Sequence, residues 1–77
     1  MNKKNFNERT GALIAFYRKI NKLTQDKLAE ILSISKIKQS RVETGKTKIE
    51  AYSLIIYAKA LKIPIEEFFK DVSKQDS

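Results

Sequence analysis

Residues 23–45 read LTQDKLAEILSISKIKQSRVETG and decide the fold of this 77-residue chain. Thr24 and Ser35 are favoured helix N-caps, because a short hydroxyl side chain can accept a hydrogen bond from a free backbone amide of the first turn. Apolar residues recur at helical spacing after Thr24, and the Ser-Ile-Ser sequence that ends at Ser35 interrupts them. The stretch therefore predicts two short helices, over residues 25–32 and from residue 36 to about residue 44, joined by a tight turn.

Basic side chains gather on the second of these helices and on the loop after it, namely Lys36, Lys38, Arg41, Lys46 and Lys48. Residues 1–48 carry twelve Lys or Arg and four Asp or Glu, whereas residues 49–77 carry four Lys and five Asp or Glu. The net charge of +7 is thus concentrated in one part of the chain, which favours a polyanionic partner such as DNA. Charge that serves solubility alone, or a lysine-rich composition, is the alternative explanation. Two helices joined by a tight turn, the second of them basic, are the layout of a helix-turn-helix motif, which places its second helix in the major groove.

The composition limits the other functions that the chain could have. Seventy-seven residues predict one domain over residues 1–77, with a core from about residue 6 to 70. Histidine and cysteine are absent, so disulfides are excluded, a zinc site would need carboxylates alone, and the usual general base is missing. We therefore expect neither an enzyme nor a cofactor. Because no apolar run reaches 18 residues and the N-terminus leads into no apolar segment, we expect a cytoplasmic protein without a membrane span or signal peptide.

Three more helices are predicted outside this stretch, which gives an all-α fold of five helices. The first should cover about residues 6–20, with Asn5 or Asn7 as its N-cap. Leu13, Ile14 and Tyr17 should form its inner face, and Ile20 could belong to it as well.

The fourth helix should cover about residues 50–61, where Thr47 and Glu50 could form a capping box. The fifth should open at Pro64, because proline is favoured in the first turn of a helix. The polar tail from Ser73 onward should be frayed.

Four parts of the pattern resemble the lambda-repressor-like DNA-binding domains, also called the Cro/repressor or xenobiotic-response-element type. These parts are Arg18 near the end of the first helix, the LTQDKLA sequence from Leu23, the VETG sequence that ends at Gly45, and the AKALKI sequence from Ala58. The resemblance covers roughly residues 10–69. It implies a compact five-helix domain whose helix-turn-helix lies at the second and third helices.

This resemblance and the position of the basic residues assign candidate roles. Side chains expected to contact base edges are Lys36, Ile37, Lys38 and Arg41. Side chains expected to contact phosphates are Gln25, Ser40, Thr44, Lys46 and Lys48. The resemblance also implies a partly buried ion pair between Arg18 and Glu43. Each role has an alternative. Arg18 and Glu43 could be independent surface charges. Lys46 and Lys48 could lie in a merely solvated loop, and Gln25 could be an ordinary residue of the first turn of its helix.

The sequence departs from the family pattern at two positions. Ser33 stands in the turn where the family usually has glycine, and a positive φ there would cost a serine roughly 1 kcal/mol. Gln39 stands where the third helix usually has Ile, Val or Leu, and a buried, unpaired amide would cost about 1–3 kcal/mol. Gln39 could be partly exposed, could hydrogen-bond to the backbone, or could reflect a rotated helix in which Ile37 shares the core.

The last two helices carry more apolar side chains than one small core can hide, and we expect a homodimer to bury Tyr52, Ile56, Ile63, Ile65 and Phe69. The predicted function is a sequence-specific transcriptional regulator that binds a pseudo-palindromic operator in double-stranded DNA. With no ligand-binding domain expected, occupancy of the operator would be its whole mechanism. Such minimal proteins resemble phage repressors, antitoxins and restriction-modification controllers. The alternatives are a protein-interaction module that kept the fold, and an RNA-binding or nucleoid protein without sequence preference.

Overall fold

A computed structural model describes residues 2–70 of the chain, and the predicted frayed tail from Ser73 lies outside them. The elements, in chain order, are α1 (Lys3–Ile20), α2 (Gln25–Leu32), α3 (Lys36–Glu43), α4 (Ala51–Leu61) and the 3-10 helix η1 (Ile65–Phe69). The predicted all-α fold is confirmed for these residues, which contain no strand. The predicted count of five α-helices is not: the described residues hold four, and the segment after Pro64 is a five-residue 3-10 helix.

The two helices of the deciding stretch begin where their N-caps predict. The Thr24 hydroxyl oxygen accepts the backbone N–H of Lys27 at 3.0 Å, and the Ser35 hydroxyl oxygen accepts that of Lys38 at the same distance. Each bond satisfies an amide that has no partner within its own helix. Hydroxyl capping is a local effect, so the sequence alone could predict both starts.

Two other predicted caps are wrong. Asn2, and neither Asn5 nor Asn7, caps α1, because Asn2 has the extended backbone and its side chain accepts the Asn5 N–H at 2.8 Å. At α4 the extended N-cap is Glu50, which makes no side-chain capping bond. Thr47 lies three residues before that cap, too early for the predicted capping box.

Four helix ends use a backbone with positive φ. Gly45 follows α3 with φ 75°, as expected for a glycine at a helix terminus. Ser33, Lys22 and Lys62 take the same conformation with φ of 58°, 58° and 61°, although each carries a side chain. The turn after α2 is therefore the left-handed turn that the resemblance implies, with serine in place of glycine.

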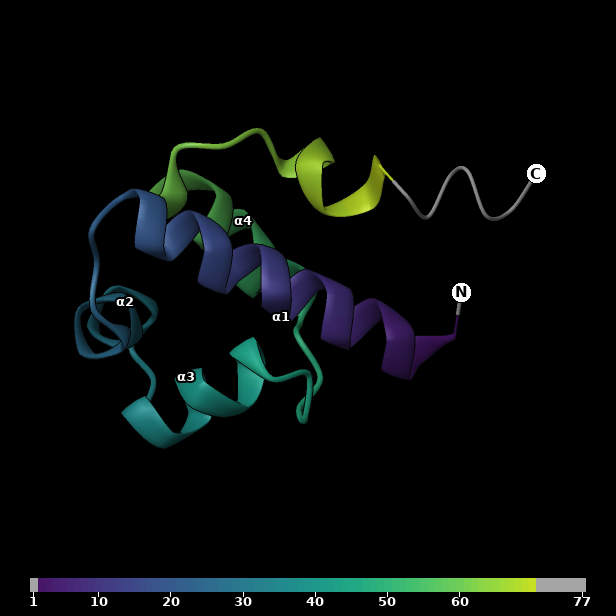
Figure 1. Cartoon of the computed structure of the whole chain (residues 1–77), viewed down its shortest axis with the longest axis horizontal. Coiled ribbons are helices and arrows are strands. Elements are labelled where there is room, and N and C mark those ends of the chain that lie inside the picture. The colour runs from purple at the N-terminus through teal and green to yellow at the C-terminus, as the bar shows by residue number, and fades with distance from the viewer. Residues whose placement is uncertain (1, 71–77) are drawn as a thin grey trace.

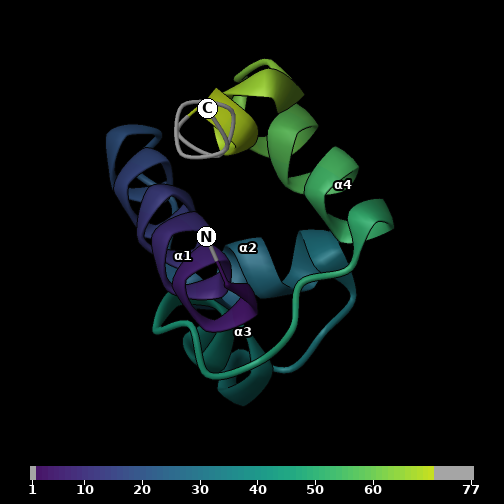
Figure 2. The ribbon, with the colours of Figure 1, turned by 90° about the vertical axis from the view of Figure 1, so that its right-hand side faces the viewer.

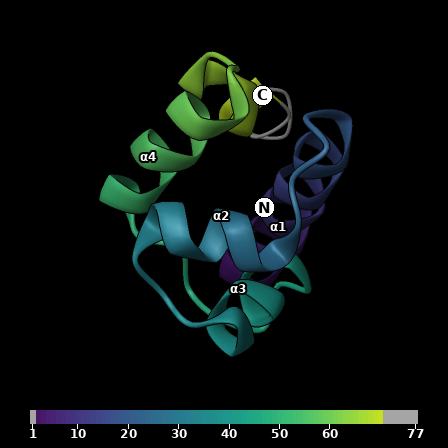
Figure 3. The ribbon, with the colours of Figure 1, turned by 90° about the vertical axis from the view of Figure 1, so that its left-hand side faces the viewer.

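The core lies between α1, α2 and α4, and its fully or nearly fully buried members are Ile14, Leu28, Leu32, Val42, Ile49, Leu54, Tyr57, Ala58, Leu61 and Phe68. Figure 1 shows α1 crossing the molecule, with η1 on one side of it and α3 on the other. Seen from either end, α3 lies at the edge of the molecule farthest from η1 (Figures 2 and 3). No described helix is long and apolar enough to cross a membrane.

Ile20 is not part of the inner face of α1, because its side chain is 58% exposed. Six residues separate it from the buried Ile14, which turns it about 120° around the helix axis. It shares a stripe with Phe16, one turn earlier, which is also exposed. The possible membership of Ile20 in the inner face is therefore wrong.

Side chains of α1 bind η1 through hydrogen bonds. The Arg9 guanidinium donates a hydrogen bond to the Phe68 carbonyl at 2.6 Å, and the Tyr17 hydroxyl donates one to the Glu67 carboxylate at 2.9 Å. Glu67 also pairs with Lys70 at 2.8 Å. The fifth segment is therefore short but tied to α1 by charge-assisted bonds, which are the stronger kind of hydrogen bond.

Candidate nucleic-acid interface

The outer face of α3 is the most exposed part of the helix-turn-helix. Gln39 and Val42 face inward and are buried, while Ile37 is 71% exposed and Lys36 and Arg41 are exposed beside it. A helix that buries one stripe against the protein offers the opposite stripe to a partner. This places three of the four predicted base-contacting residues on one solvent-facing surface.

α1 approaches the C-terminal end of α3 very closely, and Gly11 makes the approach possible. A side chain at position 11 would collide with the Val42 carbonyl and press against the Glu43 backbone. No local pattern singles out this glycine, because it lies inside a helical segment without a turn. Gly11 thereby sets how closely α3 packs against α1.

Glu43 is the anchor of α3, and it lies within reach of Arg18 as the resemblance implies. The Arg18 Nε lies 2.8 Å from Glu43 Oε2, and a second guanidinium nitrogen lies 3.1 Å from Oε1. The same guanidinium donates to the Leu23 carbonyl at 2.8 Å. Both side chains are nearly buried. This bidentate pair ties the end of α3 to the end of α1.

Two glutamines complete the set of hydrogen bonds around Glu43. Gln25 at the start of α2 donates to Oε1 at 3.1 Å, and Gln39 in α3 donates to Oε2 at 2.8 Å. Burial alone would raise the pKa of the Glu43 carboxyl. The hydrogen bonds it accepts and the charge of Arg18 outweigh burial, so its pKa lies below that of an ordinary glutamate. Glu43 therefore stays ionised at neutral pH.

The amide oxygen of Gln39 accepts a hydrogen bond from the Tyr57 hydroxyl of α4 at 2.6 Å. Gln39 is fully buried and Tyr57 is 1% exposed. Burial, followed by the nearby charge of Glu43, raises the pKa of Tyr57, so the hydroxyl remains a donor. The unusual glutamine is thus neither exposed nor bonded to the backbone: its amide oxygen and its nitrogen both bond to side chains. Sequence reasoning missed Tyr57 as its partner, because the two residues are 18 positions apart.

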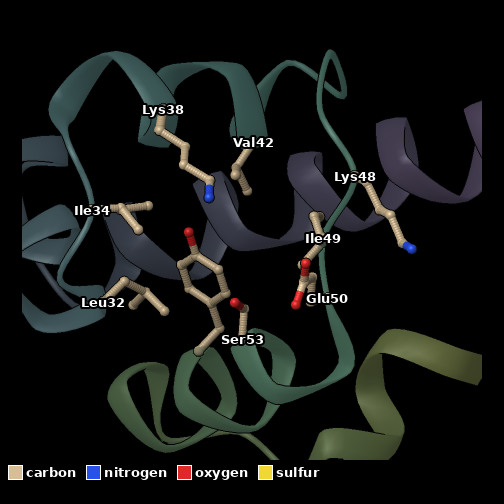
Figure 4. Close-up of a pocket in the computed structure, with 9 residues that line it drawn as sticks. Leu32, Ile34, Lys38, Val42, Lys48, Ile49, Glu50 and Ser53 are labelled. Carbon is tan, nitrogen blue, oxygen red and sulfur yellow. The ribbon is translucent and has the colours of Figure 1, made fainter.

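Lys38 stands apart from the other predicted base-contacting residues. A crevice of about 170 Å³ separates α3 from α4, and Leu32, Ile34, Val42 and Ile49 form much of its wall. Figure 4 shows the Lys38 side chain pointing from α3 into this crevice, whereas Lys48 points away from it. Lys38 is therefore on the flank of α3, and its contact with bases stays a prediction.

The predicted phosphate contacts lie around both ends of the helix-turn-helix. Lys46 and Lys48 are exposed in the loop after α3, and the Lys46 backbone N–H donates to the Arg41 carbonyl at 2.9 Å. The Thr44 hydroxyl donates to the Ser40 carbonyl at 3.0 Å. Gln25 is the first residue of α2, and its side-chain amide donates a hydrogen bond to Glu43. Its backbone amide remains at the first turn of the helix, where anions are favoured.

Acidic side chains near α3 do not cancel its positive charge. Asp26 of α2 lies 3.8 Å from the Lys36 ammonium, but both side chains are more than 60% exposed, so the pair is weak. Among the described residues, no three acidic side chains gather in a way that could hold a metal ion. Lys36, Lys38, Arg41, Lys46 and Lys48 therefore leave α3 and the loop after it with a net positive charge.

The residues predicted to mediate self-association divide into two groups. Tyr52 is 72% exposed and Phe69 is 40% exposed. Ile56, Ile63 and Ile65 are partly buried and pack against the core of the same chain. Ile55, which was not predicted, is 44% exposed and lies three residues after Tyr52, on the same face of α4. The exposed apolar surface of α4 is therefore centred one residue earlier than predicted.

Three solved structures share the architecture of this chain. The restriction-modification controller protein C.AhdI from Aeromonas hydrophila is 24% identical, with a TM-score of 0.73 over 80% of this chain and 94% of that chain. An HTH_3 family transcriptional regulator from Vibrio cholerae is 21% identical, with a TM-score of 0.77 over 91% of this chain and 39% of that chain. The clp gene regulator ClgR from C. glutamicum is 21% identical, with a TM-score of 0.79 over 94% of both chains. No protein-family model and no curated protein matches the sequence.

At these identities the similarity is one of fold. The all-α helix-turn-helix fold that the sequence predicts is confirmed. The chain spans about two fifths of the Vibrio cholerae regulator and nearly all of the other two proteins.

Proposed function

We propose that this chain is a sequence-specific transcriptional regulator that binds double-stranded DNA, with α3 in the major groove. The observation that carries the proposal is the outer face of α3, where Lys36, Ile37 and Arg41 are exposed beside one another. A guanidinium can bond two acceptors of guanine at once, and an apolar side chain can contact the thymine methyl group. The buried bonds behind α3 hold this face in place, which base recognition requires.

The phosphate contacts would come from the segments that flank α3. Lys46 and Lys48 lie where the chain leaves the helix, and the first turn of α2 at Gln25 offers backbone amides on the other side. Ser40 and Thr44 stand on the same half of α3 as Arg41. Such contacts would fix the register of the domain on the duplex without reading its sequence.

We further propose that two copies bind a pseudo-palindromic operator. Tyr52 and Ile55 give α4 an exposed apolar face, and Phe69 adds to the exposed apolar surface near the end of the described chain. A two-fold dimer that buries this surface would place its two α3 helices about 34 Å, or one turn of DNA, apart. Operators of such dimers contain inverted half-sites.

The test is selection of duplexes from a random library with the full 77-residue protein, followed by binding titrations of the enriched and a scrambled duplex at several salt concentrations. We expect an enriched inverted repeat that binds at least about 1,000-fold more tightly than the scrambled duplex. Lys36→Ala, which removes a cation from α3, should weaken the enriched duplex more than the scrambled one. Binding without any sequence preference would contradict the proposal.

A protein-interaction module remains the second candidate because of one observation. Phe16 and Ile20 form an exposed apolar stripe on α1, with exposed fractions above one half, on a helix that is not needed for DNA contact. This candidate predicts that the selection enriches no sequence and that binding to any duplex disappears at physiological salt.

A further inference from the structure

The C-terminal end of α3 is fixed on two sides. Gly11 lets α1 approach the Val42 carbonyl, and Glu43 receives bonds from Arg18 of α1 and Gln25 of α2. α3 also packs more extensively against α1 and α2 than against α4. This end of the helix therefore has little freedom to move.

The N-terminal half of α3 is fastened differently. The crevice of about 170 Å³ lies between α3 and α4, where Lys38 and Val42 line it from α3, so the two helices are not closely packed along this side. The bond from Tyr57 to Gln39 crosses from α4 to α3 at a depth where both side chains are buried. Apart from Val42, Gln39 is the fully buried side chain that α3 contributes to the interior. Of the two buried side chains of α3, Gln39 is thus held by a directional hydrogen bond. Such a bond restrains the orientation of the helix more than an apolar contact would.

The exposed residues that depend on this attachment are Lys36 and Ile37. They lie three and two residues before Gln39, in the turn of α3 that is farthest from the anchor at Glu43. Any rotation or tilt of α3 about its fixed C-terminal end would displace these two side chains more than Arg41. Loss of base recognition needs a displacement of only about 1 Å.

We propose that Tyr57 is a specificity-determining positioning residue: through Gln39 it fixes the orientation of the N-terminal half of α3, and so the geometry with which Lys36 and Ile37 meet base edges. This inference rests on the proposed function. Tyr57 touches no DNA, and it belongs to α4, whose opposite face carries Tyr52 and Ile55. The geometry of that helix is therefore transmitted to base contacts on the far side of the domain.

The test compares Tyr57→Phe, Gln39→Leu and the double variant, with Tyr17→Phe as the matched control. The control removes a tyrosine hydroxyl that bonds to Glu67, away from α3. Each single variant at the pair leaves one buried polar group unpaired and should lower the melting temperature. The double variant removes both groups, so its loss of stability should be smaller than the sum of the two single losses.

The decisive quantity is the ratio of affinities for the enriched and the scrambled duplex. We expect it to fall about tenfold in Tyr57→Phe, the equivalent of about one hydrogen bond. It should stay low in the double variant, although the loss of stability there is smaller than the sum of the two single losses, and the salt slope should not change because the phosphate contacts remain. A double variant with the wild-type ratio would show that the pair is structural alone, and so would an equal fall in Tyr17→Phe.

A second measurement separates this inference from the proposed function. Residual dipolar couplings of the free protein report the orientation of α3 relative to α1 in wild type and in Tyr57→Phe, which keeps the bond from Gln39 to Glu43. We expect a changed orientation in Tyr57→Phe whether or not the wild-type protein discriminates between duplexes. If the orientation is unchanged, the inference is wrong. If the wild type shows no discrimination while the orientation does change, the proposed function fails and the positioning by Tyr57 stands.

Discussion

Glu43 accepts hydrogen bonds from side chains of three helices, Arg18 of α1, Gln25 of α2 and Gln39 of α3. One carboxylate thereby accepts hydrogen bonds from three side chains that are buried or partly buried. The same arrangement keeps the carboxylate charged, since its pKa is lowered. Glu43 thus contributes both to the stability of the helix-turn-helix and to the position of α3.

We predict that Glu43→Gln destabilises the protein by about 3 kcal/mol at pH 7, because Arg18 loses its charged partner in a nearly buried position. A carboxyl whose pKa is lowered by folding stabilises the protein above its unfolded pKa and stops doing so as the pH falls through its folded pKa. The gap between wild type and variant should therefore shrink as the pH falls from about 5 to 3. Urea unfolding across this pH range is the measurement.

Glu66→Gln is the control for this comparison, because Glu66 is exposed, whereas Glu67 bonds to Tyr17 and Lys70. It should change the free energy of unfolding by less than about 0.5 kcal/mol. A gap between Glu43→Gln and wild type that stays constant with pH would mean that the carboxylate charge contributes nothing.

Ser33→Gly should raise the free energy of unfolding by about 1 kcal/mol, because Ser33 has φ 58° and glycine reaches this conformation without steric cost. Ser35→Gly makes the same replacement at an extended N-cap and should instead lower stability by a few tenths of a kcal/mol. Chemical unfolding measures whether the free energy of unfolding rises in Ser33→Gly and falls in Ser35→Gly. Stabilisation by both changes would point to a general effect of glycine, not to strain at position 33.

Residue-level features were predictable where the physics is local. The hydroxyl caps at Thr24 and Ser35 follow from a few neighbouring residues, whereas the positive φ at Ser33 was implied by the resemblance alone. The partner of Gln39 was not predictable, because Tyr57 comes from another helix and the pairing depends on how α3 and α4 face each other across the crevice. Gly11 was missed for the same reason, since its role appears when α1 meets α3.

At the scale of elements, α2 has the bounds that the sequence predicts, because capping and apolar spacing agree there. α1 begins earlier than predicted, since the polar residues from Lys3 onward continue the helix without apolar periodicity to reveal it. η1 is a 3-10 helix, although Pro64 and the glutamates after it also suit an α-helix. Its contacts with Arg9 and Tyr17 hold it against α1, and contacts between distant elements are not visible in a local pattern.

The exposed face of α3 and the loop after it should differ in what they recognise. Arg41→Ala should cost about 1–3 kcal/mol on the enriched duplex and barely affect the scrambled one, because a bidentate contact to guanine would be lost. Lys46→Ala should weaken both duplexes alike and reduce the salt slope by about one, as expected for a phosphate contact. Salt titrations of both variants on both duplexes are the measurement. Equal weakening of the two duplexes by Arg41→Ala would make Arg41 a phosphate contact.

At the scale of the whole molecule, basic residues lie on α3 and the following loop, while the exposed apolar residues Tyr52 and Ile55 lie on α4. The unequal charge of the two parts of the sequence predicts this division. The exposed face of α4 was predicted less well, with Ile56 in place of Ile55, because the direction in which a helix faces depends on how it packs on the core.

We predict that the wild-type protein sediments as a dimer at micromolar concentration and that the double variant Tyr52→Ser/Ile55→Ser sediments as a monomer. Burial of these side chains would supply the hydrophobic stabilisation of the dimer. Phe16→Ser/Ile20→Ser removes an equally exposed apolar pair from α1 and should leave the dimer intact. Sedimentation equilibrium decides the matter, and a wild-type protein that stays monomeric with and without DNA would contradict the prediction.

The central claim is that α3 enters the major groove, and methylation protection by dimethyl sulfate on the enriched duplex tests it most directly. The reagent methylates guanine at N7, which faces the major groove, and adenine at N3, which faces the minor groove. We predict that the wild-type protein protects guanine N7 in two half-sites about one helical turn apart, and that Arg41→Ala loses protection at one guanine of each half-site. Protection of adenine N3 alone, or bound protein that leaves every guanine N7 reactive, would contradict the claim.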